Sequence, residues 1–215
     1  MPLTKLTITY VIIAAHYCTS RWATDIALSR HKGEQLKLEV DDMSFNEINL
    51  AELNLNPFTK IEEWALLTVG DKREFNMMTI TGLMMGQLWL RKTLQVYVHP
   101  ARHSYGIINK AEYFTVSFFP EPRSKALEIA GRLHGNQCDK TKETGLTPRF
   151  DQNGVYFNEA DTVFVCRKIY HTDVQQQSFD SEEVFKKYYR DGSVFHRIFI
   201  GEIDKVLRRD RVTPE

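Results

Sequence analysis

Strand-like runs rich in aromatic and β-branched residues dominate the chain from residue 56 onward, and they constrain its fold more than any other feature. Isolated segments of helical spacing interrupt them, without the steady strand–helix alternation that a parallel α/β sheet needs. The pattern is typical of a closed or nearly closed antiparallel barrel decorated by helices, so we expect a mainly β fold. The predicted strands span residues 64–69, 75–80, 94–98, 113–119, 155–157, 162–170 and 195–207.

Turn and capping residues place further elements between these strands. Gly70-Asp71-Lys72 separates the first two runs and predicts a hairpin, whose register puts Asn76 and Met77 at the beginning of the second strand. Helices are expected at residues 104–110, 122–133, 137–143 and 181–189.

Two of the predicted helices carry boundary residues. Pro122 lies near the first turn of the helix at 122–133, and Gly135 lies beyond its end. Asp180, followed three residues later by Glu183, predicts a capping pair for the helix at 181–189.

Composition excludes several classes of protein. Lysine plus arginine number 28 and aspartate plus glutamate also number 28, so no overall basic field is available for nucleic acid. No apolar run approaches the roughly 20 residues that span a bilayer, so no membrane role is expected. Cys18, Cys138 and Cys166 are far apart, which predicts neither a disulfide framework nor a zinc site and favours a reducing, cytoplasmic location. Without a G-x-G-x-x-G loop, a Rossmann-type dinucleotide site is not supported.

The first 42 residues form an atypical N-terminal extension. They imitate a secretory signal, with Lys5 before a short apolar core at residues 8–15, but no clear small-x-small cleavage site follows. Met43 then opens a stretch typical of a cytosolic N-terminus. We therefore expect that translation starts at Met43 and that residues 43–215 form the single folded domain; a poorly ordered extension is the alternative.

Two predicted strand ends supply groups that suit a phosphate. Thr79 and Thr81 alternate along the second strand, while Arg102 and Ser104 follow the strand at 94–98 and precede a helix. Converging hydroxyls, a guanidinium fork and a helix N-terminus all favour bound anions. Arg91 is a further cation nearby in the sequence. The pattern alone leaves open an anion site or solvated charges and ordinary strand hydroxyls.

Other residues around these strand ends could line a slot for a flat ligand. His99 precedes Pro100, which favours an extended backbone, and it is either a wall for the ligand or an ordinary half-buried histidine. A group of methionines either lines a ring-binding slot or packs in the core, and core packing is the better interpretation for at least two of them. These are Met77, Met78, Met84 and Met85.

In these segments the chain resembles the flavin reductase-like family, whose fold is the FMN-binding split barrel, and in particular its flavoredoxin-like members. The resemblance covers roughly residues 50–207, and the extension at residues 1–42 lies outside it. Its motifs are individually short but occur in a specific order. They lie at residues 56–58, 64–71, 76–79, 88–89, 98–102, 113–119, 125–127, 139–140, 145–148, 166–170 and 196–203.

The resemblance implies FMN bound on the barrel of a homodimer. The FMN phosphate would be met by the strand of Thr79 and Thr81 and by the loop of Arg102 and Ser104. The isoalloxazine edge would lie along the second strand and close to the end of the strand at 94–98. The residues implied there are Asn76, Met77, Met78, Val98 and His99.

Further contacts to the flavin are implied less directly. Where relatives carry an aromatic residue and a threonine after the arginine, this chain has His103 and Ser104, so a hydroxyl is retained and the ring contact is left open. Lys140 matches the family's Asp-Lys pair and either reaches the flavin or nicotinamide or is an exposed helix charge. His196 begins the last predicted strand and could face the site. Cys166 is expected to be a small buried hydrophobe, because nothing near it argues for a lowered thiol pKa.

The resemblance leaves alternative functions. In the first, the protein is an FMN-binding oxidoreductase that accepts hydride from NADH or NADPH. In the second, it is a flavoredoxin-like electron carrier that exchanges electrons with a redox protein partner, without nicotinamide turnover; a storage module without catalysis is a third. No nucleophile, paired carboxylate or metal cluster is needed, because the flavin carries the redox chemistry.

Overall fold

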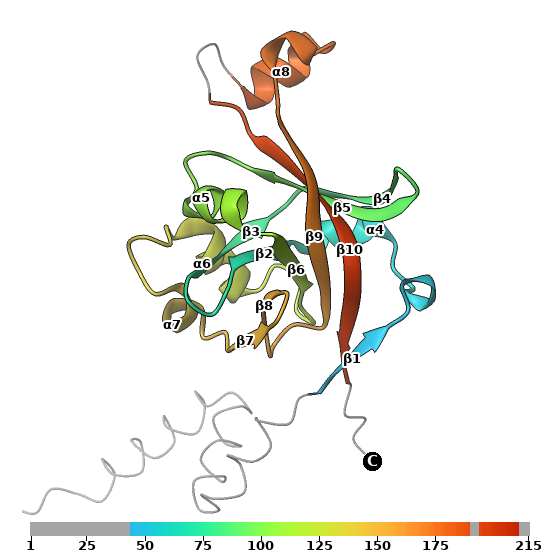
Figure 1. Ribbon diagram of the computed structural model, residues 1–215. Coiled ribbons are helices and arrows are strands. Elements are labelled where there is room, and N and C mark those ends of the chain that lie inside the picture. Colours follow the sequence, from blue (N-terminus) through green and yellow to red (C-terminus); the bar gives the residue numbers. More distant parts are fainter. Residues whose placement is uncertain (1–43, 190–193, 211–215) are drawn as a thin grey trace, which may run out of the picture. The chain divides into compact units, whose positions relative to one another are not determined.

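The computed structural model describes residues 44–189 and 194–210 (Figure 1). The expectations for residues 1–42 and for a start at Met43 lie outside the described residues. In the described part of the chain no helix is both long and apolar enough to cross a membrane.

Strands account for more of the described structure than helices do. They are β1 (Phe45–Ile48), β2 (Ala65–Gly70), β3 (Phe75–Ile80), β4 (Leu83–Leu88), β5 (Arg91–Val98), β6 (Tyr113–Phe118), β7 (Pro148–Asp151), β8 (Gly154–Phe157), β9 (Thr162–Asp173) and β10 (Arg197–Arg209). The α-helices are α4 (Pro57–Lys60), α5 (His103–Lys110), α6 (Lys125–Arg132), α7 (Lys140–Thr144) and α8 (Glu182–Tyr188). Short 3₁₀ helices are η2 (Leu50–Glu52), η3 (Ile61–Glu63) and η4 (Gln176–Ser178).

The main sheet is an eight-stranded antiparallel sheet that curls into a split barrel. Its strands run in the order β3-β2-β6-β9-β10-β5-β4, with β1 added beside β10. The end strands β3 and β4 are joined by residues 81 and 82 alone, so the sheet must curl until its two ends meet at a corner. Among the described residues no ladder joins β3 to β4. The expected antiparallel, mainly β fold is confirmed.

Two hydrophobic clusters cover the two faces of the central strands. One fills the barrel and includes Phe114, Phe164 and Phe199. The other includes Leu66 and Leu127 and packs α6 and the β7–β8 hairpin against the outside of the sheet. Residues 65–69 of β2 are all buried, which is the pattern of a strand covered on both faces.

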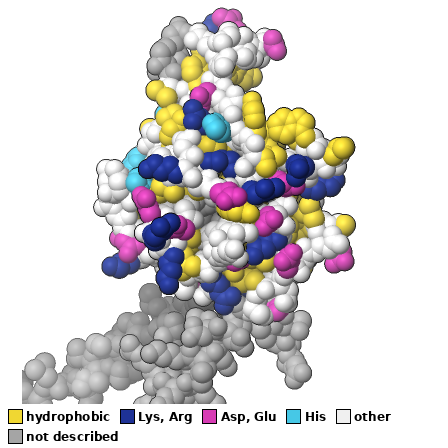
Figure 2. All heavy atoms as spheres, viewed as in Figure 1, with side chains coloured by type: hydrophobic (Ala, Val, Ile, Leu, Met, Phe, Trp, Pro, Cys, Tyr) yellow, Lys and Arg dark blue, Asp and Glu magenta, His cyan; other side chains and the backbone are white. Residues whose placement is uncertain are grey.

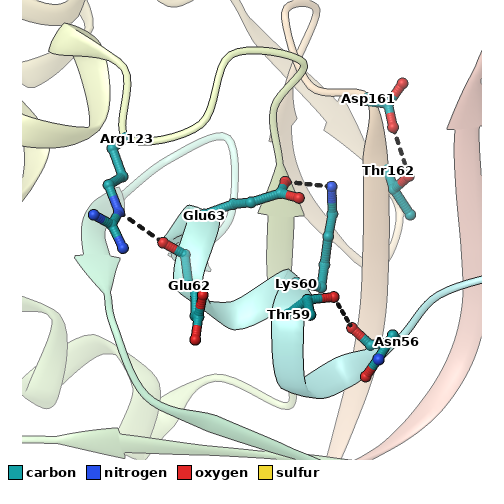
Figure 3. A network of polar contacts seen from close by, with 8 residues as sticks. All are labelled: Asn56, Thr59, Lys60, Glu62, Glu63, Arg123, Asp161 and Thr162. Carbon is teal, nitrogen blue, oxygen red and sulfur yellow. Dashed lines mark hydrogen bonds and ion pairs between the residues drawn. The ribbon is translucent and has the colours of Figure 1, made fainter.

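The helices α4 and η3 lead into β2 and are fixed by polar contacts (Figure 3). The Asn56 side chain caps α4 by accepting from Phe58 N, and Lys60 pairs with Glu63 within one turn. Arg123, in the loop before α6, donates its backbone N–H to Glu63 O and its Nε to Glu62 O, at 2.9 and 2.8 Å. This loop is therefore tied to the start of β2, which helps to set where α6 lies.

The β4–β5 hairpin was not expected from the sequence. β4 contains no β-branched residue, and its turn is Trp89-Leu90 rather than a glycine or asparagine pair. Both turn residues have positive φ, 51° and 61°, which side-chain-bearing residues rarely adopt. The expected strand at 94–98 consequently begins three residues earlier, at Arg91. β1 and β7 were also missed.

Some observed helix boundaries differ from the predicted ones because capping residues set where each helix begins. The helix expected at 137–143 begins only at Lys140, because the Asp139 side chain accepts from the backbone N–H groups of Thr141 and Lys142. Ser124 caps α6, so Pro122 lies before the helix. Ser181 rather than Asp180 caps α8, accepting from Val184 N at 3.3 Å.

A buried glycine gives a test of the barrel packing. Gly201 on β10 is buried, and a Cβ there would lie 2.7 Å from Cys166 Cβ and from ring atoms of Phe114. We expect Gly201→Ala to lower the free energy of unfolding by about 1–3 kcal/mol through overpacking. Urea unfolding measures this change.

The matched control is Gly86→Ala on β4, where a Cβ meets nothing within 4 Å. It should leave the unfolding midpoint almost unchanged. Equal midpoints for both variants would contradict the packing described here.

Candidate functional site

Several of the residues predicted to contact a ligand meet where β3, the start of α5 and α6 come together. Asn76 on β3 donates from Nδ2 to Ser104 Oγ on α5, at 2.8 Å, and both side chains are buried. A Cβ on Gly135 would lie 2.2 Å from Asn76 Oδ1, so the loop after α6 passes directly over this amide. The structure thus joins two motifs that are 28 residues apart. Ser104 itself is fully buried and lies behind Asn76.

Thr79 and Arg102 both contact the same face of α6. The Thr79 hydroxyl donates to Leu127 O, and Arg102 Nη1 donates to Gly131 O at 3.0 Å. Leu127 and Gly131 are four residues apart, which places their carbonyls one helical turn apart. The guanidinium therefore keeps further N–H groups for other acceptors, whereas the Thr79 hydroxyl proton is used in its bond to Leu127 O.

The N-terminus of α5 is suited to an anion. Arg102 is the N-cap residue of this eight-residue helix, and no side chain caps its first turn. First-turn N–H groups lack intrahelical partners and carry the positive end of the helix dipole. Thr81, immediately after β3, is exposed, while Val98 at the end of β5 is fully buried and can offer only backbone groups.

His99 and His196 form a ring pair beside this helix. Their ring centroids are 5.1 Å apart at 76°. His99 Nδ1 accepts from Ala101 N, and His196 Nδ1 pairs with the Tyr189 hydroxyl at 2.9 Å. Burial lowers the pKa of His196, and the neighbouring charges of His99 and Arg102 lower it further. A neutral His196 is therefore favoured at neutral pH.

Two cavities flank the loop after α6. One, of about 440 Å³, is lined by Arg102 and His103 together with His134, Asn136 and Gln137. The other, of about 320 Å³, is lined by residues that include Asn76, Met77, Gly135 and Lys140.

The sequence did not predict that side chains of the loop after α6 line the larger of these two cavities. The glycine within His134-Gly135-Asn136-Gln137 marked the loop, but nothing in the pattern joined it to Arg102.

Lys140 is buried, so its interpretation as an exposed helix charge is wrong. Its Nζ donates to Met77 O on β3 and to Ala130 O on α6, both at 2.8 Å, and the residue is 6% exposed. Burial lowers the pKa of Lys140 to about 8, and the charge of Arg102 adds to this effect.

Arg91 lies away from the other candidates. It begins β5, whereas Val98 ends it, and a strand of eight residues separates them by about 23 Å. Its guanidinium pairs with Glu202 at 2.6 Å, and Glu202 also binds Arg167. Arg91, a possible further cation of the site, therefore lies apart from the cluster within this chain, because closeness in sequence is lost along an extended strand.

The methionines and Cys166 behave mainly as core residues. Met77 and Met78 are buried, and Met85 packs against the barrel core, while Met84 is 60% exposed on β4. Burial raises the pKa of the fully buried Cys166 thiol, which confirms it as a small hydrophobe.

Comparisons with known proteins give one family model and several solved structures of similar fold. A family model described as flavin reductase like domain matches residues 62–215. Solved structures of similar fold include flavoredoxin from Methanosarcina acetivorans, with 16% identity, a TM-score of 0.53 and 70% of each chain covered. An FMN-binding domain of a flavin reductases-like enzyme from Shewanella baltica OS155 has 12% identity, a TM-score of 0.56 and 78% of each chain covered. Flavin reductase HpaC, complexed with NADP+, has 16% identity and a TM-score of 0.50, covering 70% of this chain and 81% of that one. No curated protein matches the chain.

The buried ammonium of Lys140 makes stability depend on pH. In the unfolded chain lysine holds its proton up to about pH 10.5, whereas the folded-state pKa is about 8. Between these values the unfolded state binds more protons, so the free energy of unfolding should rise with pH across this interval. Urea unfolding near pH 8 and near pH 10 measures the rise.

Lys140→Met should remove this rise. The control, Lys142→Met, changes a side chain on the same helix that is 83% exposed, and it should keep the rise. The assignment to Lys140 is refuted if Lys140→Met and the unaltered protein show the same pH dependence.

Proposed function

The chain belongs to the flavin reductase-like family, and on that premise we propose that it binds FMN and accepts a hydride from NADH or NADPH. The observation that carries the proposal is the uncapped N-terminus of α5 beside the Arg102 guanidinium, where α5 meets β3 and α6. A phosphate needs several converging donors, and this region offers backbone N–H groups and a guanidinium, to which the exposed Thr81 after β3 would add a hydroxyl. The donor set therefore fits the phosphate of FMN.

The backbone of β3 suits the polar edge of a flavin ring. β3 is an end strand of the sheet and, within residues 44–189 and 194–210, pairs only with β2, so its other edge has N–H and C=O groups outside the ladder. One of them, Met77 O, is taken by Lys140, and the Met77 N–H, which points to the same side of the strand, would face the ring. His99 would flank the ring from the end of β5.

In this proposal the protein supplies position rather than catalytic side chains. Bound FMN supplies the hydride chemistry at its ring. Asn76 is held by Ser104, and Thr79 and Arg102 are held by α6, so the groups around the ring are fixed before a ligand arrives. The hydride donor would have to sit at near-attack distance from the ring, which is the main contribution such a site makes to rate.

An electron carrier is the second candidate function. Its support is a fold shared with flavoredoxin and an exposed apolar surface on the β4–β5 hairpin, where Met84, Trp89 and Leu90 are 60%, 61% and 90% exposed. Such a surface would suit a redox protein partner or the second subunit of a homodimer. The face in Figure 2 otherwise mixes positive and negative side chains, which matches the balanced composition.

The phosphate assignment is tested with Arg102→Ala. Loss of a charge-assisted contact should weaken FMN binding by about 1.5–3 kcal/mol. Flavin fluorescence quenching on titration gives the affinity. Arg91→Ala, at the far end of β5, is the matched control and should leave the affinity unchanged; equal affinities for all three proteins would remove Arg102 from the site.

Nicotinamide oxidation separates the two functions. We expect the purified protein with FMN to oxidise NADH or NADPH in an absorbance assay. A protein that binds FMN yet is inert to both nucleotides would instead be a carrier. A protein that binds no FMN would exclude both functions.

A further inference from the structure

A cleft outside the corner described above lies between the barrel and a projecting arm. We define the arm as residues 174–189 and 194–196, which connect the far ends of β9 and β10 and carry η4 and α8 (Figure 1). The cleft has a volume of about 900 Å³, within the range of small-molecule sites. We call it the arm pocket; it is lined by Gly82, Tyr97, Thr172, Asp173, Val174, Gln175, Ser178, Phe179, Tyr188, Tyr189, His196 and Ile198.

The walls of the arm pocket are mainly aromatic and aliphatic. Phe179 and Tyr189 contact each other with ring centroids 5.5 Å apart, and Tyr189 also packs on Phe195 at 4.9 Å. These rings belong to a small aromatic cluster of the arm, separate from the two clusters of the barrel. Tyr188 is 66% exposed at the end of α8 although it lines the cleft. A flat ring could stack on such walls.

The polar groups of the arm pocket carry little free charge. Asp173 is bound by two nitrogens of Arg197, at 2.6 and 2.7 Å, so its carboxylate is neutralised. His196 pairs with the Tyr189 hydroxyl, and its lowered pKa keeps it neutral. An uncharged ligand therefore suits the cleft better than an anion or a cation, which would lose hydration without gaining a partner.

The arm pocket borders the proposed flavin site. His196 lines it and stacks edge to face on His99, at 5.1 Å. Gly82 and Tyr97, which also line it, are the chain neighbours of Thr81 and Val98. A ring held in the arm pocket would thus lie next to residues that we assign to the flavin.

We propose that the arm pocket binds an uncharged, planar aromatic molecule as a second ligand beside the flavin. Its binding depends only on the cleft, whereas its place next to a flavin rests on the proposed function. The walls come from β5, β9, β10 and the arm, so this ligand site exists only where the arm meets the end of the barrel.

The test uses the full chain and menadione, a neutral two-ring quinone, as the probe. Calorimetric titration measures menadione affinity with and without saturating FMN. Tyr188→Ala removes one wall at an exposed position and should weaken menadione binding about tenfold. Ser178→Trp fills the cleft from an exposed rim position and should abolish binding.

The matched control is Val184→Ala, on the same helix as Tyr188 but outside the cleft lining. It should change the affinity less than twofold. The proposal is overturned if menadione does not bind, if Tyr188→Ala and Ser178→Trp bind it as the unaltered chain does, or if Val184→Ala weakens it equally.

Two further outcomes distinguish a ligand site in the arm pocket from the flavin site and from a subunit contact. If FMN fails to bind while menadione binding follows the pattern above, the proposed function fails and the arm pocket stands. If menadione does not bind and Ser178→Trp converts a dimer to a monomer in sedimentation analysis, the cleft holds a second copy of the chain, and the proposal is wrong.

Discussion

Two cations at the C-terminal end of α6 hold the candidate site together. Lys140 Nζ binds Ala130 O and Arg102 Nη1 binds Gly131 O, and these carbonyls belong to the last turn, where the helix leaves them without partners. Positive charge there also complements the helix dipole. Because Lys140 reaches Met77 O as well, one ammonium fixes α6 against β3. The arrangement of β3, α6 and the start of α5 around the candidate site depends on this buried contact of Lys140.

The sequence predicted the fold class because strand composition and turns agreed with the final structure. The hairpin at Gly70 placed Asn76 correctly, since a glycine turn fixes register. β4 was not predicted because its residues lack strand propensity. Its turn residues, Trp89 and Leu90, also adopt positive φ, which residues with a Cβ disfavour. Tertiary packing determines where these elements form, and a local sequence pattern does not reveal tertiary packing.

The candidate site was only partly predictable. Thr79, Arg102 and Ser104 were named from their chemistry and Asn76 from the family resemblance, and the structure does bring them around α5 and α6. Only the tertiary structure shows which of these side chains are buried and hold others in place, and which are accessible. It also shows that Arg91 lies apart from them. Lys140 illustrates the limit, because a lysine in the first turn of a short polar helix gives no sign that it is buried.

The edge strand β4 has a consequence for the behaviour of the protein in concentrated solution. Its residues, Leu-Met-Met-Gly-Gln-Leu, include no charge and no proline, the usual guards of a sheet edge. Among the described residues only β5 pairs with it. A strand of this kind is a template for pairing with another chain, so the uncharged edge of β4 favours self-association of the protein at high concentration.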